Sequence, residues 1–244
     1  GEKSFNKFYL ELKNVVNETN FVGYSQTETE AELKCIIKEE KFLDEILVDN
    51  NNIFLVFNTT PFYAESGGQI GDSGKIFSED GKFICNISDT KKVEGEIYLH
   101  QIEKNEQKKI KKGTKYILSI DKERREKIRN NHSATHLLHQ SLRNILGEHV
   151  SQKGSLVSDQ KLRFDFTYNK SLTNKQIYEI EMLVNKTIRL NLIQTEELAT
   201  VREAIENGAI ALFGEKYPEK VRVITFNSDD NNLLVSKELC GGTH

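Results

Sequence analysis

Hydrophobic residues follow two different spacings, and the change divides the chain near its middle. An amphipathic helix is predicted first, because apolar residues between Phe5 and Val16 recur at helical intervals. Short apolar runs then alternate with turns rich in Asn, Asp and Gly, which is typical of strands in a small barrel or sandwich. These runs are Leu33–Ile37, Ile53–Phe57, Phe83–Ile87, Glu96–Leu99 and Tyr116–Ile120.

Beyond Asp121, the pattern mixes helices with strands. Arg124–Leu146 carries an apolar stripe at helical spacing, and Gly147 predicts its end. Capping boxes predict two more helices. They are Thr173 with Gln176, for a helix to about Leu190, and Thr200 with Glu203, for a helix ending at Gly208. Strands are expected at Leu162–Tyr168, Val221–Phe226 and Leu233–Val235.

These elements predict an α+β protein with two domains. We expect a linker helix over residues 1–19 and a small N-terminal β-barrel over 20–120. An α/β two-layer core should occupy residues 121–244. The chain begins with Gly1 and ends at His244 after a Gly-Gly-Thr run, so a fragment of a longer protein is the simpler expectation.

Composition excludes several classes of protein. The 244 residues include 13 Phe and 8 Tyr, which argues against wholesale disorder. No run of 18 apolar residues is present, so no membrane-spanning helix is expected. Three cysteines are a small and odd number, which argues against a disulfide framework and favours a reducing, cytoplasmic location. Cys35 and Cys85 lie in predicted strands and are expected to be buried thiols.

The formal net charge of −3 conceals a basic stretch. Residues 103–129 contain eleven Lys or Arg against five Asp or Glu, which gives +6. The remainder of the chain must therefore carry −9. A basic stretch can bind phosphate locally, although from charge alone a solvated surface is the simpler interpretation.

Two pairs of residues suggest a metal site. His132 and His136 lie about 40° apart on one face of the predicted helix, so both imidazoles could bind one ion. Cys240 and His244 form a second pair around Gly241–Thr243, a segment that favours a loop. One thiolate with imidazoles is typical of Zn²⁺. His139 lies near the same helix face and could be a ligand or an orienting group, although a core or surface role is the simpler interpretation.

Two loop-like segments could serve the same chemistry. PFYAESGGQIGDSG (61–74) contains Gly67, Gly68 and Gly71, and such turns allow a backbone to approach a ligand closely. HVSQKGSLV (149–157) offers Gln152 and Ser155 to a small substrate. An ordinary turn and an ordinary loop leading into a strand remain the simpler interpretations.

Taken together, these segments resemble the editing region of the alanyl-tRNA synthetase family. The matching segments, in the order found in the family, are PFYAESGGQIGDSG (61–74), RNNHSATHLLHQSLR (129–143), HVSQKGSLV (149–157), RFDF (163–166), FGEKYPEKVRV (213–223) and CGGTH (240–244). The resemblance covers residues 20–244. Free-standing alanyl-tRNA editing proteins share the histidine and cysteine motifs.

The resemblance implies a zinc site formed by His132, His136, Cys240 and His244. It also implies hydrolysis of the ester in Ser-tRNA(Ala) and Gly-tRNA(Ala), with Thr135, Gln152 and Ser155 as polar pocket residues. The expected partners are the acceptor end of tRNA(Ala), held by Lys111, Lys112 and Arg125, and the remaining domains of the synthetase. The ATP and alanine site of the synthetase lies outside this chain.

Three alternatives remain open at this stage. The chain could be a free-standing trans-editing deacylase, a zinc-stabilised tRNA-binding module without catalysis, or a zinc hydrolase acting on small molecules.

An aminoacyl ester is already activated, so we expect metal-assisted attack by water rather than an acyl-enzyme. Four protein ligands would favour a structural zinc, whereas three would leave a position for water.

Overall fold

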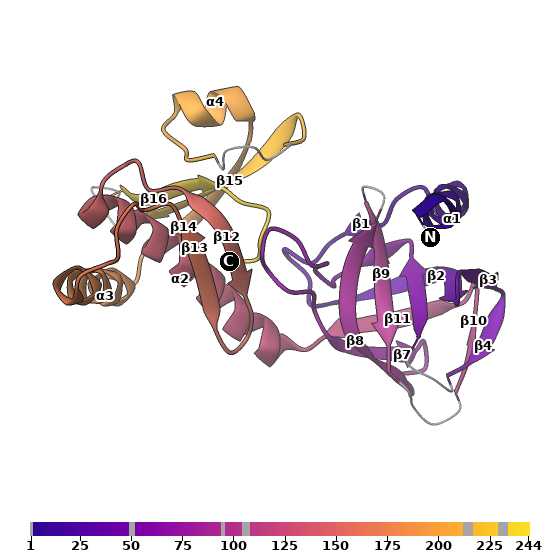
Figure 1. Ribbon diagram of the computed structural model, residues 1–244. Coiled ribbons are helices and arrows are strands. Elements are labelled where there is room, and N and C mark those ends of the chain that lie inside the picture. Colours follow the sequence, from indigo (N-terminus) through magenta and orange to yellow (C-terminus); the bar gives the residue numbers. More distant parts are fainter. Residues whose placement is uncertain (1, 49–51, 94–95, 104–107, 212–216, 229–233) are drawn as a thin grey trace. The chain divides into compact units, whose positions relative to one another are not determined.

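The computed structural model describes the whole chain except residues 1, 49–51, 94–95, 104–107, 212–216 and 229–233. It divides into two compact units (Figure 1). The first contains residues 1–66 and 70–126, and the second contains residues 67–69 and 127–244. The chain passes from the first unit to the second within one long helix, α2 (Lys122–Leu146).

The first unit is built around a ring of strands that closes on itself. Among the described residues, the hydrogen-bonded order is β11-β7-β8-β9-β5-β2, and β2 pairs again with β11, so this ring has no open edge. A further strand, β3, pairs antiparallel with one end of β2. The strands are β2 (Glu28–Lys38), β3 (Lys41–Leu43), β5 (Ile53–Phe57), β7 (Gly74–Ser78), β8 (Phe83–Val93), β9 (Ile97–Ile102) and β11 (Lys115–Ile120).

Successive residues of each strand point to opposite faces of the sheet, and the side chains that point inward fill the ring. Leu33, Leu55, Ile76, Ile87 and Leu118 are among the apolar side chains that form its core. Two short pairs flank the ring, namely β1 (Asn20–Phe21) with β6 (Thr59–Thr60), and β4 (Glu45–Leu47) with β10 (Lys109–Lys111).

The N-terminal helix α1 (Glu2–Val15) covers part of the outside of the ring. Leu12 is fully buried and packs in a cluster with Cys35, Val56 and Ile97. The side chain of Cys85 is also buried, in the ring's core. Burial raises the pKa of the Cys35 thiol to about 11 and that of Cys85 to about 12, so both stay protonated as predicted core thiols.

The second unit combines a hairpin, a small sheet and helices. Its elements after α2 are β12 (Gln152–Val157), β13 (Leu162–Phe166), α3 (Asn174–Arg189), β14 (Ile193–Thr200), α4 (Val201–Glu206), β15 (Lys220–Asn227) and β16 (Leu234–Leu239). Strands β12 and β13 pair with each other, and β14, β15 and β16 form an antiparallel sheet. Leu137 of α2 packs against Ile224 and Phe226 of β15, so the helix covers this sheet.

Most predicted elements are confirmed, and the class is α+β with a barrel in its first part. Both capping boxes are present. The hydroxyls of Thr173 and Thr200 accept the backbone N–H groups of Gln176 and Glu203, and the side chains of Gln176 and Glu203 accept the backbone N–H groups of the two threonines. Leu233 and residues 213–216 of FGEKYPEKVRV lie outside the described residues.

The interpretation of residues 149–157 as a loop holds only for residues 149–151. Gln152–Val157 is a strand, paired with β13 and irregular between Gln152 and Gly154. Strand β14 was also absent from the predictions, because its residues are polar and largely exposed and show no alternation. Within the described residues, no helix is both long enough and apolar enough to cross a bilayer.

Candidate metal centre

The histidine pair sits where α2 is buried. His132 and His136 have 5% and 6% of their surface exposed, and their rings are parallel, with centroids 5.4 Å apart. One helical turn therefore places two imidazoles side by side, as the spacing predicted.

The second pair lies in the loop that follows β16. A Cβ atom at Gly242 would collide with the ring of His132, so only glycine lets the loop lie this close to α2. Two arginines hold the loop's carbonyl groups. Arg222 Nη1 donates to Gly242 O at 2.6 Å, and Arg129 Nε donates to His244 O at 2.8 Å.

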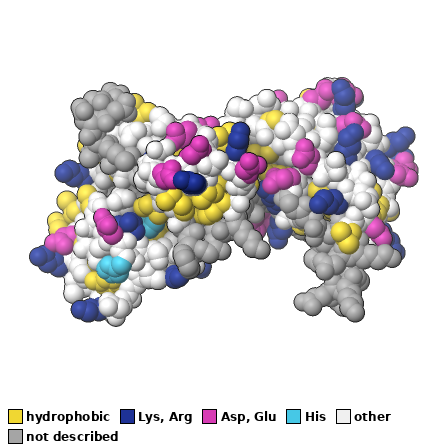
Figure 2. Space-filling view, turned by 90° about the horizontal axis from the view of Figure 1, so that it is seen from above, with side chains coloured by type: hydrophobic (Ala, Val, Ile, Leu, Met, Phe, Trp, Pro, Cys, Tyr) yellow, Lys and Arg dark blue, Asp and Glu magenta, His cyan; other side chains and the backbone are white. Residues whose placement is uncertain are grey.

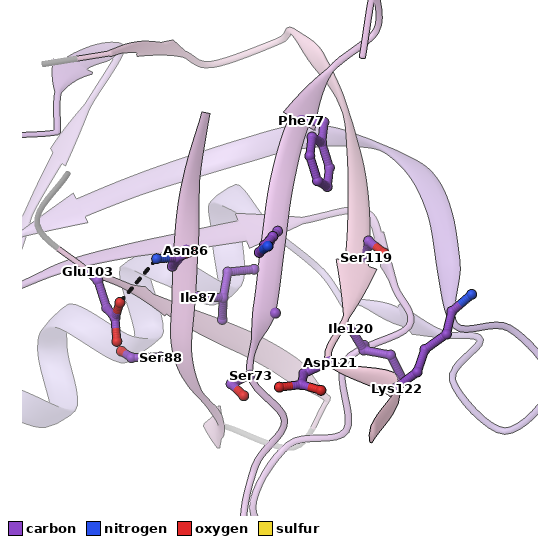
Figure 3. A pocket seen from close by; sticks show the side chains of 12 residues that line it. Ser73, Phe77, Asn86, Ile87, Ser88, Glu103, Ser119, Ile120, Asp121 and Lys122 are labelled. Atoms are coloured by element: carbon purple, nitrogen blue, oxygen red, sulfur yellow. Dashed lines mark hydrogen bonds between the residues drawn. The ribbon is translucent and has the colours of Figure 1, made fainter. Parts of the chain in front are cut away.

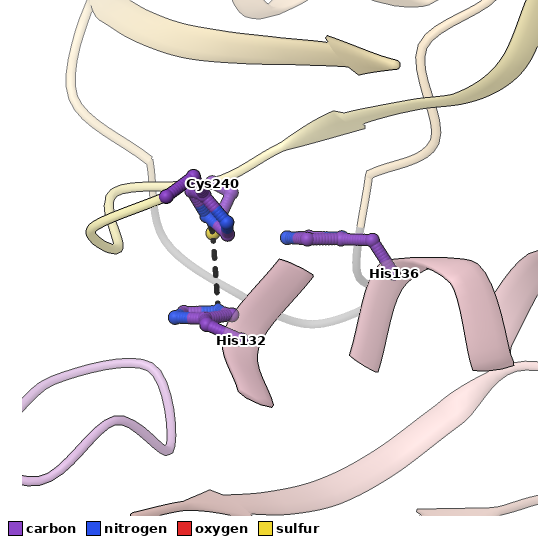
Figure 4. Close-up of side chains that lie close together, drawn as sticks. His132, His136 and Cys240 are labelled. Carbon is purple, nitrogen blue, oxygen red and sulfur yellow. Dashed lines mark hydrogen bonds between the residues drawn. The ribbon is translucent and has the colours of Figure 1, made fainter. Parts of the chain in front are cut away.

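The two pairs converge on one point inside the second unit. One potential ligand atom from each of His132, His136, Cys240 and His244 lies within 4.8 Å of all the others. Cys240 Sγ is 3.4 Å from His132 Nε2 and 3.2 Å from His244 Nε2. Figure 4 shows Cys240 above His132, with His136 reaching in from the next turn of α2. We call these four residues the His/Cys cluster.

Electrostatics favour a thiolate in the cluster. Burial raises the pKa of Cys240, but the three histidines outweigh burial and hold it well below its usual value. Burial likewise lowers the pKa of His136, yet Glu238 and Cys240 more than offset this and raise it to about 10. Burial dominates at His244, whose pKa falls to about 3.

Hydrogen bonds fix which nitrogen of each α2 histidine faces the cluster. The backbone N–H of Thr243 can only donate, so the atom of the Gln69 amide that lies 3.0 Å from it is the oxygen, Oε1. The same oxygen is 2.8 Å from His132 Nδ1, which must therefore carry a hydrogen. In the same way, Glu238 Oε2 lies 2.9 Å from His136 Nδ1 and accepts its hydrogen. In both rings, Nε2 is the nitrogen that faces the cluster.

The residues present fit a metal ion. His136 Nε2 is buried and has no hydrogen-bond partner among the described residues, so it lacks a contact that a metal would supply. Three imidazoles and one thiolate are donors that soft and borderline divalent ions accept. Orienting partners on the far ring nitrogens are a regular feature of such sites.

His139 is placed beside the His/Cys cluster and is not one of its members. It is 1% exposed, and its Nδ1 lies 3.1 Å from Glu238 Oε1. Glu238 thus contacts two histidines at once. Burial raises the pKa of Glu238, but His136 and His139 outweigh this effect and lower it to about 2.

The predicted pocket residues lie in the same unit. Thr135 is 5% exposed, and its hydroxyl donates to Asn131 O at 2.8 Å within α2. Gln152 and Ser155 are half-buried on β12. Gly68 lies against Ser155 so closely that a Cβ atom at residue 68 would collide with the serine hydroxyl.

The predicted glycine positions fall in different units. Gly67 and Gly68 have positive φ angles of 57° and 85°, and both belong to the second unit. Gly71 belongs to the first unit, where a Cβ atom would collide with the carbonyl of Thr90. The motif is therefore a close-packed connection that crosses from the first unit into the second and back.

The predicted basic residues belong to the first unit, and one of them is buried. Lys111 and Lys112 are exposed, and Lys112 lies 4.0 Å from Asp44. Arg125, in contrast, is 4% exposed. Its guanidinium contacts the Asp72 carboxylate and donates to the carbonyls of Gly23 and Pro61. Because these contacts occupy its side chain inside the barrel unit, Arg125 holds the fold together instead of facing solvent.

Charge is mixed on one face of the molecule. On the face shown in Figure 2, basic and acidic side chains alternate, and no area of a single sign dominates. Several lysines of the basic stretch have acidic neighbours, such as Lys109 with Glu45 at 2.8 Å and Lys115 with Glu30 at 2.7 Å. Residues 104–107 of this stretch lie outside the described residues.

A separate hollow of about 620 Å³ lies on the barrel unit (Figure 3). Its charged residues balance, since Lys75 and Lys122 are accompanied by Glu103 and Asp121. None of the predicted site residues lines it. It has neither the donor set of the cluster nor a strong charge, and we assign it no role.

Sequence reasoning missed Gln69 and Glu238. Gln69 lies within the glycine-rich segment, yet nothing in the segment showed which side chain would be buried. Glu238 lies two residues before Cys240, and in a strand that spacing places both side chains on one face. That alternation was the one available signal for Glu238.

Comparisons with known proteins show which family the sequence resembles. A sequence model of the family described as class II tRNA synthetases (A) matches residues 1–124. Alanine–tRNA ligases from Parvibaculum lavamentivorans and Wolbachia pipientis are each 44% identical to the chain, and that from Sphingopyxis alaskensis is 45% identical. Each alignment covers all of this chain and 27% of the relative. The chain thus spans about a quarter of the length of these curated relatives.

Proposed function

Because the chain belongs to the family of class II tRNA synthetases (A), and its curated relatives over the full length include alanine–tRNA ligases, we propose that it is an editing segment. Its substrates would be Ser-tRNA(Ala) and Gly-tRNA(Ala), and its reaction the hydrolysis of the aminoacyl ester. The observation that carries this proposal is the buried His/Cys cluster, which lies outside the family match and inside the region aligned with the ligases.

Zn²⁺ is the proposed occupant of the cluster. His132, His136 and His244 would bind through Nε2, and Cys240 through its thiolate. When bound, such an ion would supply Lewis acidity and could lower the pKa of a water molecule. Because Cys240 is surrounded by three imidazoles, its sulfur is a ligand in this proposal and the attacking nucleophile is water.

Selection of serine over alanine would fall to polar side chains near the cluster. A hydrogen bond to the serine hydroxyl favours serine, because alanine would leave the buried partner unpaired. The Thr135 hydroxyl donates within α2 and keeps acceptor capacity for a substrate hydroxyl. Gln152 and Ser155 complete the proposed polar set from β12.

The rest of the substrate is tRNA, and the rest of the enzyme lies elsewhere in the longer ligase. We propose that Lys111 and Lys112 contact phosphates of the acceptor end. The remaining domains of a full-length ligase would carry aminoacylation and additional tRNA contacts.

One observation favours a second candidate. Four protein ligands would complete a tetrahedron, which is typical of structural zinc. The second candidate is therefore a zinc-stabilised tRNA-binding module without catalysis.

The test is to measure zinc content and then the release of labelled serine from Ser-tRNA(Ala), with Ala-tRNA(Ala) as the control. Editing predicts serine release that is lost in Cys240→Ala and no release of alanine. The assay uses micromolar to millimolar concentrations of charged tRNA, so that weak binding in the absence of the rest of a ligase does not hide the reaction. Stoichiometric zinc without serine release at those concentrations would reject editing and favour the binding module.

A further inference from the structure

The glycine-rich segment ends in a buried side chain that touches the His/Cys cluster. Gln69 is fully buried, and it belongs to the second unit together with Gly67 and Gly68. A neutral amide is seldom buried completely unless it is hydrogen-bonded. The contacts of Gln69 therefore indicate why it is there.

Those contacts join the two elements that supply the ligands. Gln69 Oε1 accepts from His132 Nδ1 at 2.8 Å and from the backbone N–H of Thr243 at 3.0 Å. Its Nε2 donates to the hydroxyl of Thr243 at 2.9 Å. One amide thereby connects α2 to the residue between Gly242 and His244.

The backbone of the segment is fitted to deliver this side chain. Gly68 accepts the backbone N–H of Val157 at 2.7 Å, and Gln69 forms a parallel bridge with Val157. Positive φ angles at Gly67 and Gly68 turn the chain, and contact with Ser155 excludes a side chain at residue 68. The two glycines thus allow the segment to lie along β12 with Gln69 turned toward His132.

We propose that Gln69 is the positioning residue of the metal site, which fixes the Nδ1–H form of His132 and aims its Nε2 at the ion. The inference rests on the proposed metal site and assigns a purpose to the glycine-rich segment. Gln69 acts through His132 and the 240–244 loop, and it needs no contact with substrate. Removal of an orienting partner of this kind lowers metal affinity about 10- to 100-fold.

The experiment compares Gln69→Met, Gln69→Glu and Gln160→Ala in the 244-residue chain. Gln69→Met retains bulk and removes every hydrogen bond, whereas Gln69→Glu retains an acceptor for His132 Nδ1 and Thr243 N. Gln160 is exposed in a turn of the same unit and is the matched control. Zn²⁺ affinity is measured by competition with a chelator, and the Co²⁺-loaded proteins are compared by their visible absorption spectra.

We expect Gln69→Met to weaken Zn²⁺ binding 10- to 100-fold and to alter the Co²⁺ spectrum. Gln69→Glu should remain within about threefold of the parent, as should Gln160→Ala. Thermal melting of the metal-free proteins measures any loss of folding separately. If Gln69→Met melts lower but the folded protein binds Zn²⁺ with parental affinity, Gln69 is merely structural and the inference is overturned.

Equal losses in Gln69→Met and Gln69→Glu would also overturn it, because an acceptor would then be irrelevant. His136→Ala separates this inference from the underlying proposal. If His136→Ala retains full Zn²⁺ affinity, the metal site itself is rejected. If His136→Ala loses affinity and Gln69→Met does not, only the role of Gln69 is rejected. If Gln69→Met fails to fold, loss of affinity or of the parental Co²⁺ spectrum in folded Gln69→Glu still overturns the inference.

Discussion

At the scale of single residues, the His/Cys cluster depends on groups that do not themselves face its centre. Glu238 accepts from His136 Nδ1 and His139 Nδ1 through its two carboxylate oxygens. A carboxylate offers two acceptors, and both are needed because both histidines are buried. Glu238 therefore orients His136 much as Gln69 orients His132.

Glu238→Gln should weaken Zn²⁺ binding about 10-fold or more. The substituted amide has one oxygen and one NH₂ group, so it can accept from only one of the two histidines. Chelator competition measures the change in affinity. Glu197→Gln is the matched control, because Glu197 is an exposed glutamate that pairs with Lys237 of β16. Parental affinity in Glu238→Gln would show that His136 needs no carboxylate partner.

Another buried histidine, His100, lies in the core of the barrel unit. Its Nδ1 donates to Leu55 O at 3.0 Å, so its Nε2 accepts the Thr60 hydroxyl at 2.7 Å. This arrangement requires the neutral ring. Burial lowers the pKa of His100 to about 4, although the hydrogen bond to Leu55 partly opposes this effect.

His100 should make the stability of the barrel unit depend on pH. The unfolded chain binds this proton below about 6.5 and the folded chain only below about 4, so the unfolded state binds more protons between these values. Stability is therefore complete above pH 6.5 and falls as the pH drops toward 4. At about 1.4 kcal/mol per pKa unit, the loss approaches about 3 kcal/mol.

Urea denaturation between pH 7 and 4.5 measures this loss. His100→Gln should flatten the dependence relative to the parent, because glutamine does not titrate. His149→Gln, which removes an exposed histidine, should leave the dependence unchanged. Identical pH profiles for the parent and His100→Gln would mean that another group is responsible.

At the scale of elements, a buried arginine helps to fix the start of α2 to the barrel. Arg125 contacts Asp72 and the carbonyls of Gly23 and Pro61, three segments that are distant in sequence. Asp72 also accepts the backbone N–H of Tyr63 at 2.7 Å. The buried pair thus aligns the first turn of α2 with the beginning and end of the glycine-rich segment.

Arg125→Ala should lower the free energy of unfolding of the barrel unit by about 3–5 kcal/mol, because the Asp72 charge would remain buried without its partner. Arg202→Ala should cost less than about 1 kcal/mol, since Arg202 and Glu206 form an exposed pair on α4. Urea denaturation compares the two. A similar small loss in both would show that Asp72 is stabilised without Arg125.

Elements with a regular pattern were predictable, and contacts between distant segments were not. The α2 stripe and the boxes at Thr173 and Thr200 follow from local spacing, and the structure contains all three. Strand β14 carries Glu196 and Glu197 in its middle and is recognisable only through its pairing with β15. Gln69 meets His132 across 63 residues of chain, a distance over which periodicity carries no information.

At the scale of the whole molecule, the proposed chemistry lies beyond the match to the family model, although the alanine–tRNA ligases align with the entire chain. The family match ends at residue 124, close to the boundary between the two units at residues 126–127. The His/Cys cluster lies entirely beyond it. A barrel that is matched by the synthetase family is thus joined in one chain to a unit that carries the proposed hydrolytic site.

A contribution of the barrel to tRNA binding would explain why it is joined in one chain to the unit that carries the proposed hydrolytic site. Lys111 ends β10 and Lys112 follows it, and both are exposed. Acidic neighbours such as Asp44 do not prevent such a role, because exposed ion pairs are worth only about 0–1 kcal/mol and yield to a phosphate. Binding by these lysines would be electrostatic and strongly dependent on salt.

Reversing both charges, in Lys111→Glu/Lys112→Glu, should weaken binding of tRNA(Ala) and reduce the slope of log affinity against log salt by about 1 per lysine. Filter binding between about 50 and 200 mM salt measures both quantities. Lys13→Glu/Lys41→Glu reverses two exposed lysines of the same unit and matches the change in net charge. If the two double variants lose affinity equally, only overall charge matters and the site at Lys111 and Lys112 is rejected. A larger loss and a flatter slope in Lys111→Glu/Lys112→Glu alone would place phosphate contacts on the barrel, because a general charge effect would change both variants to the same extent.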